Sequence, residues 1–345
     1  MPFINDQLAG NRERLARECR LPAPARASRF VFEPEQVMAL LRERILGQEA
    51  VLDAMEAMLQ VAKADIGSEE RPLAVHLFMG PTGVGKTETV RLLAQAIHGR
   101  PDAMCRIDMN TLAQEHYAAA LTGAPPGYVG SKEGHTLFDE NAIQGSFSKP
   151  GIVLFDELEK ASREVILTLL NVLESGRLTL SGGARQIDFR NTLIFMTSNV
   201  GAADASIYRS RFQQGWRRWL GITPSREEAV WERALHQRFD PEFLNRIDRI
   251  LAFRRLDEQW MERLLEIELA KLNRRLDRRG AHIDLDADAR RHLCRSHDSR
   301  FGARDLARRL RTELEPALAR TLLACPDEFR FLARQGLSGL EVSPC

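Results

Sequence analysis

Cysteine pairs, long apolar runs and an excess of one charge are all missing from this 345-residue sequence. Its five cysteines are widely spaced and form no C-x-x-C pair, which argues against a disulfide framework and against a cysteine-based metal site. Lysine plus arginine number 49 and aspartate plus glutamate 48, so the net charge of +1 gives no support to a nucleic-acid-binding or membrane-surface protein. We expect reduced thiols and a cytoplasmic location.

The amino-terminal part lacks the features of a targeting segment. Residues 1–26 are polar and charged, without the apolar stretch of a signal peptide. No apolar run approaches the roughly 18 residues that a membrane span needs, so we expect no membrane segment. Pro22, Pro24 and scattered arginines give residues 1–34 no core of their own, which predicts a weakly ordered N-terminal extension.

Short apolar runs alternate with helical stretches between residues 35 and 253. Two helices broken at Gly47 are expected over 35–66, and another helix over Thr87–His98. The candidates for buried strands are 75–79, 105–109, 152–155, 192–196 and 250–253. Strands that are buried on both faces and separated by helices predict an α/β domain over 35–253, with a five-stranded parallel sheet flanked by helices.

After residue 253 the sequence becomes mostly helical. Leu306, Leu310 and Leu314 share one helix face, and an earlier apolar stripe runs through the 261–272 stretch. Short strand candidates lie at 283–285 and 329–332. The pattern predicts a small, mostly helical C-terminal domain over 254–345.

A glycine-rich loop follows the first strand candidate and precedes a helix. It matches the pattern G-x-x-x-x-G-K-[ST] with Gly80, Pro81, Thr82, Gly83, Val84, Gly85, Lys86 and Thr87. Glycines let backbone N–H groups turn inward around phosphate oxygens, and the new helix presents its positive end to the same anion. Lys86 is expected to reach the β- and γ-phosphates and the Thr87 hydroxyl to ligate Mg²⁺. The order of strand, loop and helix makes a chance glycine-rich turn the weaker alternative.

Two acids end another buried strand. Ile152-Val153-Leu154-Phe155 is followed by Asp156 and Glu157, which places both carboxylates at the edge of the sheet where ligands of α/β proteins bind. Asp156 suits the Mg²⁺ shell, directly or through water, and Glu157 suits a base that polarises the attacking water. Solvated strand-end acids are the alternative, but their place downstream of a phosphate loop favours the catalytic interpretation.

With these motifs, the stretch from about 45 to 310 resembles the second ATPase module of the ClpA, ClpB and ClpC chaperones. The resemblance implies an AAA+ P-loop fold that binds ATP and Mg²⁺. Ile45 and Leu46 resemble the segment that clasps adenine, and Asn199 the first sensor, which orients water. Arg246, in Pro241-Glu-Phe-Leu-Asn-Arg246, resembles the arginine finger, and Arg304, in Phe301-Gly-Ala-Arg304, resembles the second sensor.

Two further segments resemble parts of the family that handle protein. The loop Gly127, Tyr128, Val129 and Gly130 resembles the pore loop that grips substrate, where a flat aromatic side chain would pack against any extended polypeptide. The tripeptide Leu220, Gly221 and Ile222 lies where protease-coupled members carry a peptidase-docking tripeptide, although it does not end in Leu or Phe. Helix packing of Trp216, Trp219 and Leu220 is the competing interpretation.

The resemblance implies a homo-oligomeric, hexameric ring that hydrolyses ATP and pulls protein substrates through a central pore, with a ClpP-like peptidase or an adaptor as a further partner. The family's N-terminal domain and first ATPase module are not in this sequence, and the 135–149 stretch is a few residues longer than usual. A dedicated factor that disassembles one complex is the main alternative. A nucleic-acid motor or clamp loader is opposed by the near-zero net charge and by the pore-loop likeness.

Overall fold

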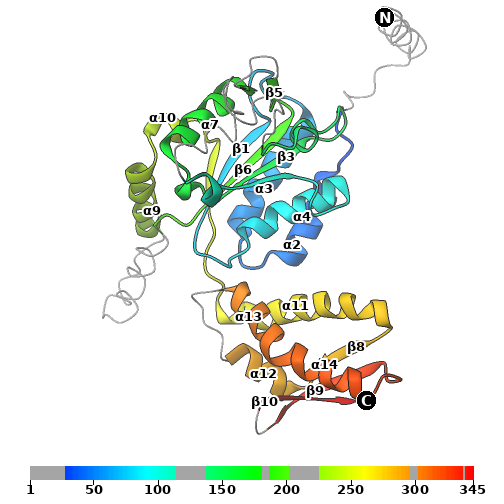
Figure 1. The fold of residues 1–345 in the computed structure, drawn as a ribbon. Coiled ribbons are helices and arrows are strands. Elements are labelled where there is room, and N and C mark those ends of the chain that lie inside the picture. Colours follow the sequence, from blue (N-terminus) through cyan, green and yellow to red (C-terminus); the bar gives the residue numbers. More distant parts are fainter. Residues whose placement is uncertain (1–27, 114–136, 181–185, 202–224, 296–301, 337–338) are drawn as a thin grey trace, which may run out of the picture.

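The structure, a computed structural model, describes residues 28–113, 137–180, 186–201, 225–295, 302–336 and 339–345 (Figure 1). Its larger part is built on a single five-stranded sheet, in the order β2-β3-β6-β1-β7. The strands are β1 (Ala74–Met79), β2 (Cys105–Asp108), β3 (Gly151–Asp156), β6 (Thr192–Ser198) and β7 (Arg249–Ala252). All four pairings within it are parallel. The predicted five-stranded parallel sheet is confirmed.

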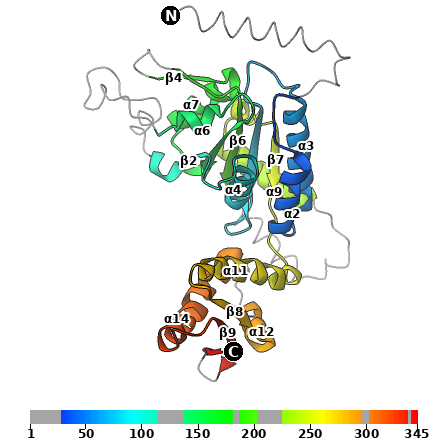
Figure 2. The same ribbon diagram turned by 90° about the vertical axis from the view of Figure 1, so that its right-hand side faces the viewer.

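Helices cover both faces of this sheet because alternate strand residues point to opposite sides. Val153 and Phe155 of β3 lie in one apolar core, which also contains buried residues of α7 (Arg163–Ser175), α9 (Ser225–Arg238) and α10 (Pro241–Leu244). Ile152 and Leu154 of the same strand lie in a second core. That core is completed by the helices α2 (Pro34–Arg44), α3 (Glu49–Ala64) and α4 (Lys86–His98) (Figure 2).

Shorter elements join these layers. They are η1 (Met109–Leu112), α6 (Glu140–Gln144), η3 (Leu158–Lys160) and the antiparallel pair β4 (Arg177–Thr179) and β5 (Gln186–Asp188). Ahead of α2, Phe30 and Phe32 are buried in the second core, and the Lys63 ammonium donates to both of their carbonyl oxygens. Residues 28–33 therefore pack on the large part, whereas residues 1–27 lie outside the described residues.

A third core belongs to the carboxyl-terminal part, which Figure 1 shows below the large sheet, with α11 and α13 nearest to it. Its helices are α11 (Met261–Leu276), α12 (Ala287–Arg295), α13 (Ala303–Arg309) and α14 (Glu315–Ala324), with short turns η5 (Glu258–Trp260), η6 (Asp277–Arg279) and the π-helical η7 (Leu310–Leu314). Strands β8 (His282–Leu285), β9 (Arg330–Gly336) and β10 (Gly339–Pro344) form a small sheet. The sequence indicated the first two of these strands but not β10.

None of the helices in the described ranges combines the length and apolarity required to cross a bilayer. The connection between the two parts is held by Gln48, whose side-chain amide donates to the Arg254 carbonyl (2.8 Å) and accepts from its N–H (2.9 Å). This paired bond fixes the chain just where it leaves β7. The glycine-rich loop after β1 and the carboxyl-terminal part are in contact, since the Ala303 N–H donates to the Gly83 carbonyl oxygen.

Candidate active site

The phosphate loop is folded by its glycines. Gly80, Gly83 and Gly85 have φ values of 139°, 78° and 106°, which side chains other than glycine rarely adopt. At Gly80 a Cβ atom would also lie 2.4 Å from the Phe253 carbonyl oxygen. The loop is thus pressed against the end of β7 and delivers Lys86 and Thr87 to the first turn of α4.

Lys86 is nearly buried and points back into the loop. Its ammonium donates to the carbonyls of Gly80 and Pro81 and to the Asn199 Oδ1 at 2.8 Å. The parallel register that pairs Met79 with Ser198 brings Asn199 to this place. Two predicted site residues that are 113 positions apart are therefore in direct contact.

Burial lowers the pKa of Lys86 to about 8, although the nearby carboxylates of Glu159 and Asp156 act in the opposite direction. A bound phosphate would restore the charged form. Nucleotide binding should then take up a proton above pH 8, so the affinity for ADP should fall as the pH rises, by up to about tenfold per unit. Binding of fluorescent ADP at pH 7.5 and 9.5 measures this. Lys86→Met should bind weakly but lose this pH dependence; an equally steep dependence in that variant would contradict the assignment.

Asp156 ends β3 between side chains from both neighbouring strands. Its Oδ1 accepts from the Thr197 hydroxyl of β6 (2.5 Å), and its Oδ2 accepts from the Arg106 guanidinium of β2 (2.6 Å). The Thr87 hydroxyl lies 3.3 and 3.4 Å from the two carboxylate oxygens. The predicted pair Thr87 and Asp156 is brought together at the carboxyl edge of the sheet.

These donors fit Mg²⁺, which prefers oxygen ligands and is usually bound by one or two protein groups together with substrate phosphates. Thr87 and Asp156 supply a hydroxyl and a carboxylate beside the loop that would hold those phosphates. Within the described ranges there is no cluster of three or more His, Cys, Asp or Glu that could hold a metal by itself. The arrangement therefore suits a metal that enters with its nucleotide.

Glu157 adopts the left-handed backbone conformation, with φ 58° and ψ 52°. For a residue with a Cβ this costs about 1–2 kcal/mol. The strain is offset by local bonds: its N–H donates to the Thr197 hydroxyl (3.0 Å), and its carboxylate accepts from the Asn110 amide (2.6 Å). The strand thus turns sharply, and the carboxylate is held beside the end of β2.

Sequence reasoning missed Arg106, Asn110 and Thr197, which all touch the acidic pair. Arg106 and Asn110 lie around the end of β2, and Thr197 stands two residues before the predicted sensor Asn199. A polar residue at the end of a parallel strand was the available signal, because neighbouring strand ends converge at one edge.

Arg304 reaches the site from the other part of the chain. Gly302 lies on the phosphate loop: its φ is 53°, and a Cβ there would be 2.6 Å from the Gly83 carbonyl oxygen. The next N–H, of Ala303, donates to that same oxygen at 2.9 Å. Arg304 follows in the first turn of α13, and its charge is one of those that lower the pKa of Lys86. Contact with the loop thus requires glycine at position 302 and fixes the backbone just before Arg304.

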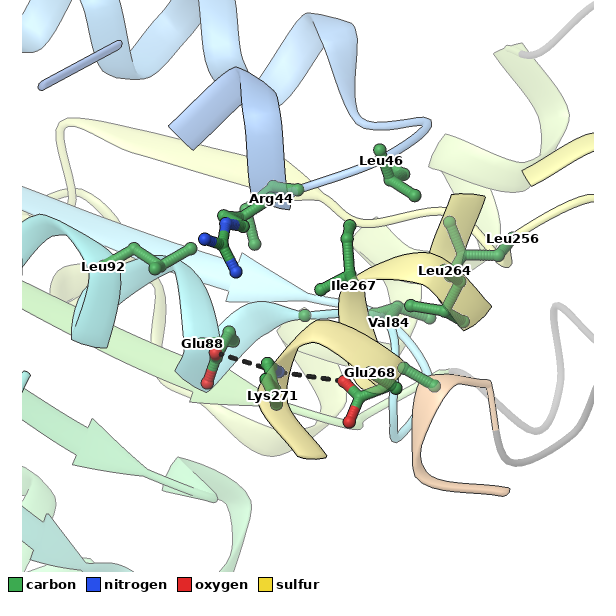
Figure 3. A pocket seen from close by; sticks show the side chains of 13 residues that line it. Arg44, Leu46, Val84, Glu88, Leu92, Leu256, Leu264, Ile267, Glu268 and Lys271 are labelled. Atoms are coloured by element: carbon green, nitrogen blue, oxygen red, sulfur yellow. Dashed lines mark hydrogen bonds and ion pairs between the residues drawn. The ribbon is translucent and has the colours of Figure 1, made fainter. Parts of the chain in front are cut away.

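A hollow between α4 and α11 adjoins the loop (Figure 3). Ile45 and Leu46, predicted to clasp adenine, both line it. Its other apolar walls are Val84, Leu92, Leu256, Leu264 and Ile267. Lys271 bridges the two parts here, with ion pairs to Glu88 (3.5 Å) and Glu268 (2.9 Å). An apolar slot with a few charged groups suits a flat heterocyclic base.

Arg246 lies at the opposite edge of the sheet. Asp248, two residues on, bonds the backbone of Val75 at the start of β1, while the phosphate loop follows the end of β1. Strands rise about 3.3 Å per residue, so the length of β1 separates Arg246 from the loop by roughly 15–20 Å. Its guanidinium pairs instead with Glu174 of α7 at 2.6 Å. Arg246 is not part of the site on its own chain.

Two predicted segments, 127–130 with Tyr128 and 220–222, lie outside the described residues.

A family model described as "AAA domain (Cdc48 subfamily)" matches residues 71–250, just over half of the chain. A second, the "C-terminal, D2-small domain, of ClpB protein", matches residues 256–327. The chain belongs to the Clp-type AAA+ ATPases. As such it is an enzyme that hydrolyses ATP.

The chain is similar to relatives of two kinds. It is 46% identical, over a 344-residue alignment, to the ATP-dependent protease ATP-binding subunit-like protein AmiB of Pseudomonas aeruginosa, with 94% of this chain and 93% of that protein covered. A Rhodococcus erythropolis protein with a similar name is 43% identical, with 94% and 92% covered. The chaperone protein ClpB of Propionibacterium freudenreichii is 40% identical over 82% of this AAA+ chain, which spans only 31% of that protein.

Proposed function

We propose that this ATPase assembles into a homohexameric ring and uses ATP hydrolysis to pull polypeptide through a central pore. The position of Arg246 carries the proposal. An arginine that stabilises charge on the γ-phosphate contributes roughly 10³- to 10⁵-fold in rate. Arg246, however, is separated from the phosphate loop of its own chain by the length of β1. A neighbouring subunit can supply it, and hydrolysis then depends on assembly.

The remaining groups have roles within one subunit. Lys86 and the loop N–H groups hold the phosphates, and Thr87 and Asp156 would hold the Mg²⁺ that neutralises them. Glu157 takes a proton from the attacking water, which Asn199 orients from the end of β6. Arg304 contacts the same phosphates from the carboxyl-terminal part, so loss of the γ-phosphate changes the angle between the two parts.

Tyr128 is proposed to convert that change into grip on the substrate. Tyr128→Ala should leave ATPase activity within about twofold of the wild type but reduce unfolding of a tagged globular substrate at least tenfold, because a methyl group has little surface to hold a chain. Tyr128→Phe, which keeps the ring, should unfold at nearly the wild-type rate. Unimpaired unfolding by the alanine variant would remove the gripping role and leave the ATPase assignment intact.

A peptidase is the partner that the relatives' printed names favour, since two of them are named as ATP-binding subunit-like proteins of an ATP-dependent protease. We propose Leu220, Gly221 and Ile222 as the docking tripeptide. The rival function is disassembly of one dedicated complex, and stimulation of the ATPase by an unrelated unfolded protein such as casein would speak against it.

A further inference from the structure

Asp156 is a buried carboxylate with a cationic partner that the ATPase motifs do not account for. Its residue is only 7% exposed. Removing a charge from water is costly unless another charge or several hydrogen bonds compensate it. The Arg106 guanidinium, 2.6 Å from Oδ2, supplies the opposite charge.

The other nearby cation does not bond Asp156. The Lys86 ammonium donates its three hydrogen bonds to the carbonyl oxygens of Gly80 and Pro81 and to Oδ1 of Asn199. Among the side chains that the structure describes, Arg106 is therefore the cation that hydrogen-bonds the carboxylate. Thr87 and Thr197 add neutral hydroxyls to it. Without a metal, the local charge balance rests on Arg106.

The position of Arg106 allows its guanidinium to move away from the Asp156 carboxylate. It belongs to β2, the edge strand of the sheet, and its side chain is 48% exposed. Thr197, on the inner strand β6, is by contrast buried. The guanidinium can turn into water without opening the apolar core, because the core side chains of β2 are Cys105 and Ile107 on the other face.

We propose that Arg106 is a stand-in cation: it neutralises Asp156 while no metal is present, and it competes with the Mg²⁺ that accompanies the nucleotide. This rests on the proposed metal role of Thr87 and Asp156. A single positive charge held against the carboxylate repels an incoming dication. Arg106 therefore lowers the affinity for Mg²⁺ and ensures that the buried acid is compensated throughout the nucleotide cycle.

Arg106→Gln tests this in the full-length protein. Loss of the positive charge beside the proposed Mg²⁺ site should lower, by about tenfold, the Mg²⁺ concentration that gives half of its effect on ADP binding (the Mg²⁺ midpoint). The same variant should melt about 2–4 °C lower than wild type in EDTA, because its buried carboxylate is uncompensated. The difference in melting temperature should close in saturating Mg²⁺ and ADP. Arg106→Lys, which keeps the charge, should have nearly the wild-type midpoint.

Arg42→Gln is the matched control, since the Arg42 side chain has nearly the same exposure, 49%, and also forms ion pairs, but with Asp53 and Glu56. Its Mg²⁺ midpoint should not move. An Arg106→Gln midpoint equal to or above the wild-type value overturns the stand-in role; a higher one would make Arg106 a brace that orients the carboxylate. If wild-type protein binds ADP equally in EDTA and in Mg²⁺, the metal assignment itself fails and the inference falls with it.

Discussion

Glu157→Gln should bind ATP with nearly wild-type affinity and hydrolyse it 10²- to 10⁴-fold more slowly, the range that a general base contributes. The substitution keeps the shape of the side chain. It also keeps an oxygen that can accept from the Asn110 amide, so the strained turn at residue 157 should remain folded. What is lost is the basic oxygen that takes the proton from water. Steady-state ATPase assays together with fluorescent-nucleotide binding separate the two effects.

Glu164→Gln provides the control for this variant. Glu164 is an exposed residue in the first turn of α7. Its substitution should leave the turnover rate within about twofold of wild type, as surface substitutions usually change little. Brisk hydrolysis by Glu157→Gln would remove the base assignment and direct attention to Glu159, whose carboxylate accepts from the N–H of Asn199.

Arg246→Ala should reduce turnover by roughly 10³-fold or more without weakening ATP binding, since an arginine finger acts on the transition state. The fold should tolerate the change, because the partly exposed pair with Glu174 contributes at most about 1 kcal/mol. ATPase turnover, nucleotide affinity and melting temperature measure the effects on hydrolysis, on binding and on stability separately. Arg163→Ala, at an exposed position on α7, is the control and should behave as wild type.

Mixing two inactive variants tests whether the finger acts across subunits. In a ring with head-to-tail contacts, an Arg246→Ala subunit keeps its own Glu157, and a Glu157→Gln neighbour keeps the finger. An equal mixture should regain about one quarter of wild-type activity, since half of the sites keep the base and half of those meet an intact finger. If the mixture recovers no activity after subunit exchange, the contact across subunits is contradicted. Wild-type protein that is inactive only when diluted to monomers would still show that hydrolysis depends on assembly.

Much of the fold was predictable because its three inner strands, β1, β3 and β6, are buried along their whole length. The run at 152–155 is apolar at every position and the run at 75–79 at every position but His76, and β1 and β3 extend them by only one or two residues. The edge positions were harder: Met109 continues the apolar pattern of β2 but lies in a short 3₁₀ turn after it. Strand β10 carries polar and charged residues and packs only part of its length, so periodicity did not indicate it.

The sequence by itself determined the identity of the main chemical groups of the candidate site. A phosphate loop and a strand-end acid pair are local motifs: their residues are contiguous, and each function depends on backbone conformation at neighbouring positions, as the glycine φ values and the turn at Glu157 show. Only the tertiary structure decided which distant side chains belong to them. The register of the parallel sheet sets Arg106 against Asp156 and Asn199 against Lys86, and the same register carries Arg246 to the opposite edge. The spacing of residues along the chain does not predict that register, because strand order follows from packing of the whole sheet.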